Sequence, residues 1–219
     1  MVTINNLSKN YASNMVYRSV NLELPSNRAA YLMGKNGAGK TTLLKCLLEL
    51  ESYQGEIRFD GKKFREIQQE IFAVYDDCPF YDNLSGYKNI NLFTSQKCKE
   101  QDDICNKYLS GDVLRKSVKS YSYGQRKKLA LIITELLNPK YLFLDEISNG
   151  LDYEATISLQ NHIISIKSKC SVVLIGHQFD FYESIVDDVY IINNGTISSK
   201  IDYTRCGKSL KEIYDENIK

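Results

Sequence analysis

Residues 34–41 read G-K-N-G-A-G-K-T, and this stretch decides the fold of the chain. It matches the pattern G-x-x-x-x-G-K-[ST], whose fixed positions are filled here by Gly34, Gly39, Lys40 and Thr41. Glycines allow the backbone to wrap closely around a phosphate group, because they adopt positive φ and carry no Cβ. The stretch therefore predicts a phosphate-binding loop.

The sequence on either side of the loop supports this interpretation. The apolar run 29–33 predicts a strand before the loop, and leucines at helical spacing predict a helix over about 39–50. N–H groups at the start of that helix would face an anion, Lys40 would reach the β- and γ-phosphates, and the Thr41 hydroxyl would bind Mg²⁺. The predicted nucleotide-binding residues of the loop are Gly34, Lys35, Asn36, Gly37, Ala38, Gly39, Lys40, Thr41 and Thr42.

A second motif lies at Tyr141–Glu146, where an apolar strand ends in two adjacent acids. This is the Walker B arrangement of nucleotide hydrolases. Asp145 would hold Mg²⁺, and Glu146 would act as the general base that deprotonates the attacking water. Adjacent acids at a strand end also occur in solvated turns, but the upstream phosphate loop makes the catalytic interpretation the favoured one.

The composition limits the class of protein. The 219 residues suffice for one large domain, and 28 basic against 27 acidic residues give a net charge of +1, which disfavours nucleic-acid binding. The sequence shows no apolar run long enough to span a bilayer and no signal peptide. Six cysteines without a C-x-x-C pair predict reduced thiols rather than disulfides or a zinc site. We therefore expect a cytosolic protein.

The order of apolar and polar segments predicts the architecture. Buried strands alternate with helices, which favours an α/β fold with a mainly parallel sheet. The first part is β-rich, including a strand over 16–24, and residues from about 83 to 137 are expected to form an inserted α-helical subdomain. Further strands are expected at 55–59, 71–75, 141–144, 171–175, 189–192 and 196–201, and further helices at 125–137, 154–167 and from about 208.

One stretch is diagnostic of a protein family: Ser122, Tyr123, Gly124 and Gln125, within Y-S-Y-G-Q-R-K-K-L-A-L. They resemble the L-S-G-G-Q signature of the ATP-binding domain of ABC transporters, and the resemblance covers nearly the whole chain. It implies that Ser122, Gly124 and Gln125 complete the ATP site of an opposite subunit. Tyr121 stands for the leucine and Tyr123 for the first glycine. Taken alone, the stretch is also an ordinary helix cap.

Three further segments fit the same resemblance. Residues 147–152 are similar to the D-loop, with isoleucine in place of proline, which puts Asp152 at a dimer interface. His177 follows an apolar strand and takes the position of the switch histidine that contacts the γ-phosphate. Tyr11 takes the position of the aromatic residue that stacks on adenine. His162 lies in a polar helix and is expected at the surface.

The Q-loop is a departure from the family pattern. The family has a glutamine after the strand that corresponds to 71–75, and alignment on Asn83-Leu84-Ser85 places Asp76 at that position. Asp76 can still bind Mg²⁺ but adds negative charge beside the phosphates. If the alignment shifts by one residue, Asp77 takes the role instead.

The resemblance implies an ATPase that uses ATP and Mg²⁺ and closes as a dimer with a second copy or a homologous ATPase subunit. Closure would drive a separate integral membrane permease, so the protein would be peripheral on the inner face of the cell membrane. Peptide or antibiotic export is the favoured use. The alternatives are a non-transport ABC-type ATPase and a non-hydrolysing regulator gated by nucleotide. The sequence identifies neither the substrate nor the direction of transport.

Overall fold

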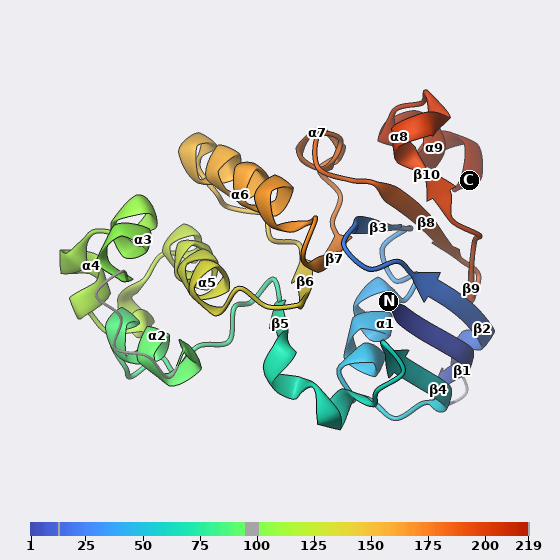
Figure 1. Ribbon diagram of the computed structural model, residues 1–219, viewed down its shortest axis with the longest axis horizontal. Helices are drawn as coiled ribbons and strands as arrows, with labels where there is room; N and C mark the ends of the chain where they lie inside the picture. The colour runs from blue at the N-terminus through green and yellow to red at the C-terminus, as the bar shows by residue number, and fades with distance from the viewer. Residues whose placement is uncertain (13, 95–100, 219) are drawn as a thin grey trace.

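A computed structural model describes residues 1–12, 14–94 and 101–218, so Cys98 and part of the expected helical stretch lie outside the described residues. The chain forms two sheets with helices beside them (Figure 1). The strands are β1 (Val2–Tyr11), β2 (Asn14–Leu24), β3 (Ala29–Met33), β4 (Gln54–Phe59), β5 (Ile71–Val74), β6 (Tyr141–Asp145), β7 (Ser171–Ile175), β8 (Asp188–Asn193), β9 (Thr196–Ile197) and β10 (Ile201–Asp202). The α-helices are α1 (Lys40–Leu47), α2 (Gly86–Thr94), α3 (Gln101–Tyr108), α4 (Gly111–Arg115), α5 (Tyr123–Leu137), α6 (Tyr153–Ile166), α7 (Phe179–Tyr182), α8 (Tyr203–Cys206) and α9 (Leu210–Asn217).

The large sheet is mainly parallel, in the order β10-β8-β3-β7-β6-β5, with β9 beside β8. Strands β3, β6 and β7 are buried along their whole length, because elements cover both faces of the sheet. Parallel strands bring their carboxyl ends to one edge. The phosphate loop after β3, the acids at the end of β6 and the histidine after β7 therefore meet there.

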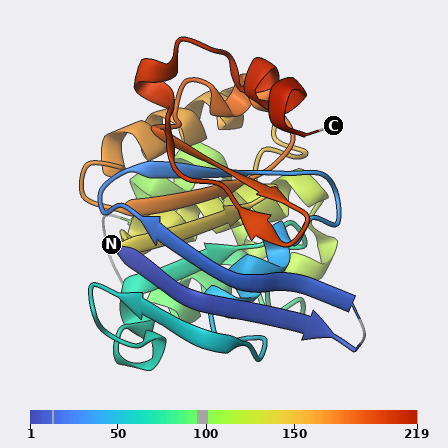
Figure 2. The ribbon, with the colours of Figure 1, turned by 90° about the vertical axis from the view of Figure 1, so that its right-hand side faces the viewer.

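The small sheet is antiparallel, with β1 between β2 and β4. In Figure 2 its two longest strands, in blue, run across the front of the molecule. One hydrophobic cluster joins this sheet to α1 and to one face of the large sheet, and α5, α6 and α9 contribute to a second cluster. The expected fold class is confirmed: an α/β core, an antiparallel N-terminal sheet and inserted helices.

The inserted helices α2 to α5 lie to one side of the large sheet (Figure 1). The helix expected over 125–137 begins two residues earlier, at Tyr123. Ser122 is its N-cap, and Ser122 and Gln125 form a reciprocal capping box. The side chain of Gln125 thus satisfies a backbone N–H at the helix start.

Other boundaries also differ from the expectation. Helix α1 ends at Leu47, because Glu49 adopts φ 51° and the N–H groups of Glu49 and Leu50 bond to Cys46 and Lys45, a Schellman ending. The strand expected over 196–201 is interrupted. Only Thr196–Ile197 and Ile201–Asp202 pair with β8, at its opposite ends.

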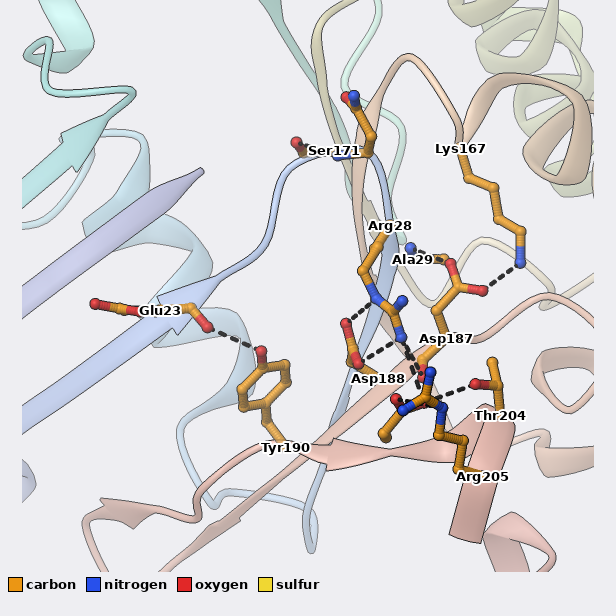
Figure 3. Close-up of polar contacts among 12 residues, drawn as sticks. Glu23, Arg28, Ala29, Lys167, Ser171, Asp187, Asp188, Tyr190, Thr204 and Arg205 are labelled. Carbon is orange, nitrogen blue, oxygen red and sulfur yellow. Dashed lines mark hydrogen bonds and ion pairs between the residues drawn. The ribbon is translucent and has the colours of Figure 1, made fainter. Parts of the chain in front are cut away.

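An ion-pair network lies at the edge of the large sheet away from the phosphate loop (Figure 3). The Arg28 guanidinium donates to both oxygens of the fully buried Asp188, at 2.6 and 2.9 Å. Asp187 accepts from the Ala29 N–H at 2.9 Å and from Lys167 Nζ at 2.6 Å. These contacts fasten the starts of β3 and β8 to each other and to the end of α6.

Candidate active site

The phosphate loop has the backbone conformation that its glycines permit. Gly37 and Gly39 have φ of 79° and 108°, which L side chains rarely adopt. A Cβ on Gly39 would lie 2.8 Å from Val16 Cγ1, and one on Gly34 would lie 2.7 Å from the Ile192 carbonyl oxygen. The loop therefore requires glycine at Gly37 for conformation, at Gly34 for space and at Gly39 for both.

Lys40 begins α1 and points back into the loop. Its Nζ donates to the carbonyl oxygens of Gly34 (2.8 Å) and Lys35 (3.0 Å), and lies 3.4 Å from His177 Nε2. Burial lowers the pKa of Lys40, while nearby Glu146 and Asp145 act in the opposite direction. The cation thus lies where phosphate oxygens would be expected.

Thr41 in the phosphate loop and Asp145 at the end of β6, both expected to bind Mg²⁺, are in contact. The Thr41 hydroxyl donates to Asp145 Oδ2 at 2.8 Å, and burial raises the pKa of Asp145. A hydroxyl and a carboxylate are the oxygen ligands that Mg²⁺ takes in nucleotide hydrolases. Tyr75 lines the same cleft, and its buried hydroxyl has no hydrogen-bond partner within the described part of the chain. The donor set fits the ion.

Glu146 lies beside this pair in a strained backbone conformation, with φ 52°. Its carboxylate accepts from Asn149 Nδ2 at 3.3 Å, and Gln178 Nε2 in turn donates to Asn149 at 3.2 Å. His177 Nε2 lies 3.5 Å from Glu146 Oε1. Burial first, and then the charge of Asp145, raise the pKa of Glu146, as suits a general base.

The surroundings of His177 favour the neutral form of its imidazole. Burial lowers its pKa, and the charge of Lys40 lowers it further. A neutral imidazole can either donate or accept a hydrogen bond at Nε2. Because Nε2 faces both Lys40 and Glu146, the side chain lies between the phosphate-binding cation and the expected base.

These residues line one cleft of about 700 Å³. The sequence-predicted residues on its wall are Tyr11, Asn36, Gly37, Gly39, Lys40, Thr41, Thr42, Asp76, Asp145, Glu146 and His177. Asp77, the expected alternative to Asp76, also lies on the wall, and the structure adds Asn14, Val16, Lys45, Leu50, Tyr75, Pro79 and Ile175. No motif pointed to these seven residues, because they come from segments that meet only in the folded chain.

Tyr11 lies at the open part of the cleft, with 40% of the residue exposed. Lys9 Nζ lies 4.5 Å from the centre of its ring. One face of the ring therefore has a cation beside it. Stacking of adenine on this tyrosine stays a prediction.

Ser122, Gly124 and Gln125 lie at the start of α5 and do not line the cleft. The Gln125 N–H donates to Ser122 Oγ at 3.2 Å, and the Ser122 N–H donates to Gln125 Oε1 at 3.0 Å. The geometry is a helix cap, and the same N-terminus presents N–H groups suited to an anion. Their role toward the nucleotide of a second copy stays a prediction.

Asp76 lies on the cleft wall, beside Asp77. Its Oδ1 accepts hydrogen bonds from the Tyr123 hydroxyl and from Lys127 Nζ. Asp76 and Tyr123, two of the positions that depart from the family pattern, are therefore in contact. Binding of Mg²⁺ by Asp76 stays a prediction, as does the alternative role of Asp77.

The expectation for His162 was wrong. Its side chain is 11% exposed and its Nδ1 lies 3.5 Å from Glu135 Oε1. Burial lowers the pKa of His162. Its neighbour Asn161 is exposed, whereas His162 lies beside Glu135 of α5 and Lys107 of α3, and contacts between helices have no signal in the local sequence.

Comparison with known proteins assigns the chain to a family. The ABC transporter family model matches residues 17–149. The lantibiotic transport ATP-binding protein SrtF of Streptococcus pyogenes is 32% identical over 224 aligned positions, which cover 100% of this chain and 97% of that protein. The bacitracin transport ATP-binding protein BcrA of Enterococcus faecalis is 26% identical, over 100% of this chain and 74% of that protein.

Two solved structures share the fold. An ATP-binding subunit of an ABC transporter superposes with a TM-score of 0.88 at 22% identity, covering 99% of this chain and 98% of that one. The ATP-binding cassette MJ0796, solved as a dimer in a post-hydrolysis state, superposes with a TM-score of 0.80 at 18% identity, covering 93% and 99%. Across residues 1–12, 14–94 and 101–218, no helix is both long and apolar enough to cross a membrane. The chain belongs to the ABC transporter family, as an ATP-binding and ATP-hydrolysing subunit.

Proposed function

We propose that this subunit pairs head-to-tail with a second copy, or with a homologous ATPase subunit, to drive export of a peptide antibiotic through a separate membrane permease. The observation that carries the proposal is that the expected ATP-site residues lie in two separate places on the chain. Lys40, Thr41, Asp145, Glu146 and His177 share one cleft, whereas the signature residues lie outside it at the start of α5. A second chain can therefore supply the signature to each cleft.

The export of a peptide antibiotic is inferred from two relatives, whose names describe lantibiotic and bacitracin transport. The proposal includes a single ABC ATPase domain over residues 1–219, with the helical subdomain at about 83–137. The permease would hold this domain at the inner face of the cell membrane, in the cytoplasm. Nucleic acid is not an expected partner, since the net charge is +1.

In this proposal each side chain has a defined task. Glu146 orients the attacking water and takes its proton, and the raised pKa of Glu146 makes it a stronger base than an exposed carboxylate. His177 contacts the γ-phosphate, and Lys40 stabilises the charge that develops on it. Thr41 and Asp145, with Asp76, would hold Mg²⁺, which neutralises phosphate charge when bound.

A mixing experiment tests the shared site. Ser122→Arg should abolish steady-state hydrolysis by placing a bulky cation at the signature, while leaving ATP binding by the monomer intact. Lys40→Ala should be inactive because its own cleft is damaged. An equimolar mixture should regain roughly a quarter of wild-type activity, since half of the dimers would be mixed and each would have one intact site of two.

The control variant is Ser168→Arg, which places the same side chain at an exposed serine after α6. It should hydrolyse ATP at the wild-type rate. Full activity of Ser122→Arg alone, or a mixture no more active than its parts, would contradict the shared site.

A further inference from the structure

Three side chains meet where the loop after β5 approaches the start of α5: Asp76, Tyr123 and Lys127. We call them the lock. Asp76 Oδ1 accepts a hydrogen bond from the Tyr123 hydroxyl and a second one from Lys127 Nζ, at 3.2 Å. Both donors thus converge on a single oxygen atom, which joins the helical subdomain to the edge of the large sheet.

Lys127 is the central member of the lock. Its side chain is 0% exposed, so its charge needs partners inside the protein. Besides Asp76, its Nζ donates to the backbone carbonyl oxygen of Glu146 at 3.1 Å, and it lies 5.3 Å from the centre of the Tyr123 ring. The lysine therefore bridges the loop after β5 and the loop after β6 from within α5.

The Tyr123 ring is folded against its own chain. A Cβ placed on Gly150 would lie 2.3 Å from Tyr123 Cδ1, so the ring occupies the space that glycine leaves. The neighbouring Gly124 is equally close to the same loop, since its Cβ would lie 2.7 Å from the Gly150 carbonyl oxygen. The start of α5 and the loop after Glu146 are thus packed together through two glycines.

The Glu146 backbone needs such support. With φ 52°, Glu146 has a backbone conformation that non-glycine residues rarely adopt and that persists only where the surrounding structure determines it. Its N–H donates to the Ile175 carbonyl oxygen at 2.9 Å, and its carbonyl oxygen accepts from the Asn149 N–H at 3.2 Å. Lys127 supplies a further donor to this carbonyl, and its donor is charged.

We propose that Lys127 is a positioning residue for Glu146, and that Tyr123 and Asp76 hold Lys127 in place. The hydrogen bond to Asp76 holds the Tyr123 side chain against its own subunit. The N-terminus of α5 then stays accessible to an anion. This inference rests on the proposed function for its catalytic consequence, but the lock itself does not.

A double-variant cycle on folding stability tests whether the lock exists. The variants are Tyr123→Phe, Asp76→Ala and the pair together, each unfolded in urea without nucleotide. If the hydroxyl bonds to Asp76, each single variant lowers the urea midpoint and the double variant lies no lower than Asp76→Ala. Shifts that simply add would overturn the lock. Tyr153→Phe is the matched control, since Tyr153 is also the first residue of its helix but is 80% exposed, and its midpoint should not move.

Steady-state kinetics with Mg-ATP test the positioning role. Lys127→Met should lower kcat by about tenfold or more and change KM by less than about twofold, as expected when support for a catalytic group is lost. Lys127→Arg keeps a charged donor and should recover most of kcat. Unchanged kcat in Lys127→Met, or equal losses in the Met and Arg variants, would overturn the positioning role.

The two failures are distinguishable. A wild-type protein that hydrolyses no ATP would overturn the proposed function and the role of Lys127, while the urea cycle would still decide the lock. An active wild type with additive midpoints would overturn the lock and leave the proposed function standing.

Discussion

The Thr41 hydroxyl donates a 2.8 Å hydrogen bond to Asp145 Oδ2, although the two residues are 104 positions apart in sequence. The contact joins the first turn of α1 to the end of β6. Because α1 follows β3 and β6 lies two strands away in the sheet, only the parallel order β3-β7-β6 brings these oxygens together. The proposed Mg²⁺ ligands are thus a product of strand order.

Thr41→Val should weaken the response to Mg²⁺, because valine has the shape of threonine but supplies no ligand oxygen. We expect the Mg²⁺ concentration for half-maximal ATPase activity to rise by about tenfold or more. Thr41→Ser retains the hydroxyl and serves as the control. Identical Mg²⁺ titrations for the valine and serine variants would show that this oxygen is not a ligand.

Glu146→Gln should bind ATP but not turn it over, because the amide cannot accept the proton from water. We expect kcat to fall by about a hundredfold or more, with the Kd for ATP within about threefold of wild type. ATP should then trap a dimer that size-exclusion chromatography resolves. Glu23→Gln, at an exposed position of β2, should behave as wild type. Unchanged turnover in Glu146→Gln would remove it as the base.

Arg28→Met should destabilise the fold, because it leaves the fully buried Asp188 without its guanidinium partner. Breaking such a pair costs about 3 kcal/mol or more of unfolding free energy. Urea unfolding at neutral pH measures the loss. Arg115→Met breaks an exposed pair with Asp112 and should cost less than about 0.5 kcal/mol. Equal losses would mean that burial of Asp188 does not matter to stability.

Asp60 should make stability depend on acid pH. Lys140 at 2.8 Å lowers the pKa of Asp60, followed by the N-terminal ammonium, and the Tyr141 hydroxyl also donates to it at 2.7 Å. A carboxyl whose folded pKa is depressed contributes stability above its unfolded pKa, and this contribution is lost as pH falls through the folded value.

Asp60→Asn should therefore be less stable than wild type by about 1 kcal/mol at pH 7, since the carboxylate is partly exposed. The difference should shrink as the pH falls below about 4, where the unfolded carboxyl takes up its proton. Urea midpoints of both proteins from pH 7 to pH 3 test this. A difference that stays constant over that range would contradict the assignment to Asp60 ionisation.

Local sequence predicted those parts of the protein whose physics is local. Gly37 and Gly39 have the positive φ that a phosphate loop demands, and the apolar run before Asp145 became a fully buried strand. Such features depend on backbone freedom and on burial patterns, and both can be predicted from residues that are close together in the sequence. The order of loop, acids and histidine along the chain therefore sufficed to predict the cleft.

Tertiary packing decided the remainder. His162 was expected at the surface, yet its side chain is only 11% exposed and lies beside Glu135 of α5. Helix α1 ends at Leu47, before a left-handed turn at Glu49 that the pattern of polar and apolar residues did not indicate. The position of His162 depends on a contact between helices, whereas the end of α1 depends on local hydrogen bonds from Glu49 and Leu50 back to the last turn.

The sequence by itself determined a nucleotide cradle, two acids and a helix cap, because each is a short pattern with a mechanism of its own. Only the tertiary structure decided that two of the departures from the family pattern, Asp76 and Tyr123, are in contact. Asp76 and Tyr123 are 47 positions apart, and they share an oxygen with Lys127 because α5 packs beside the end of β5. Hydrogen bonds between residues so far apart in sequence depend on how the helices pack, and local sequence patterns do not predict that packing.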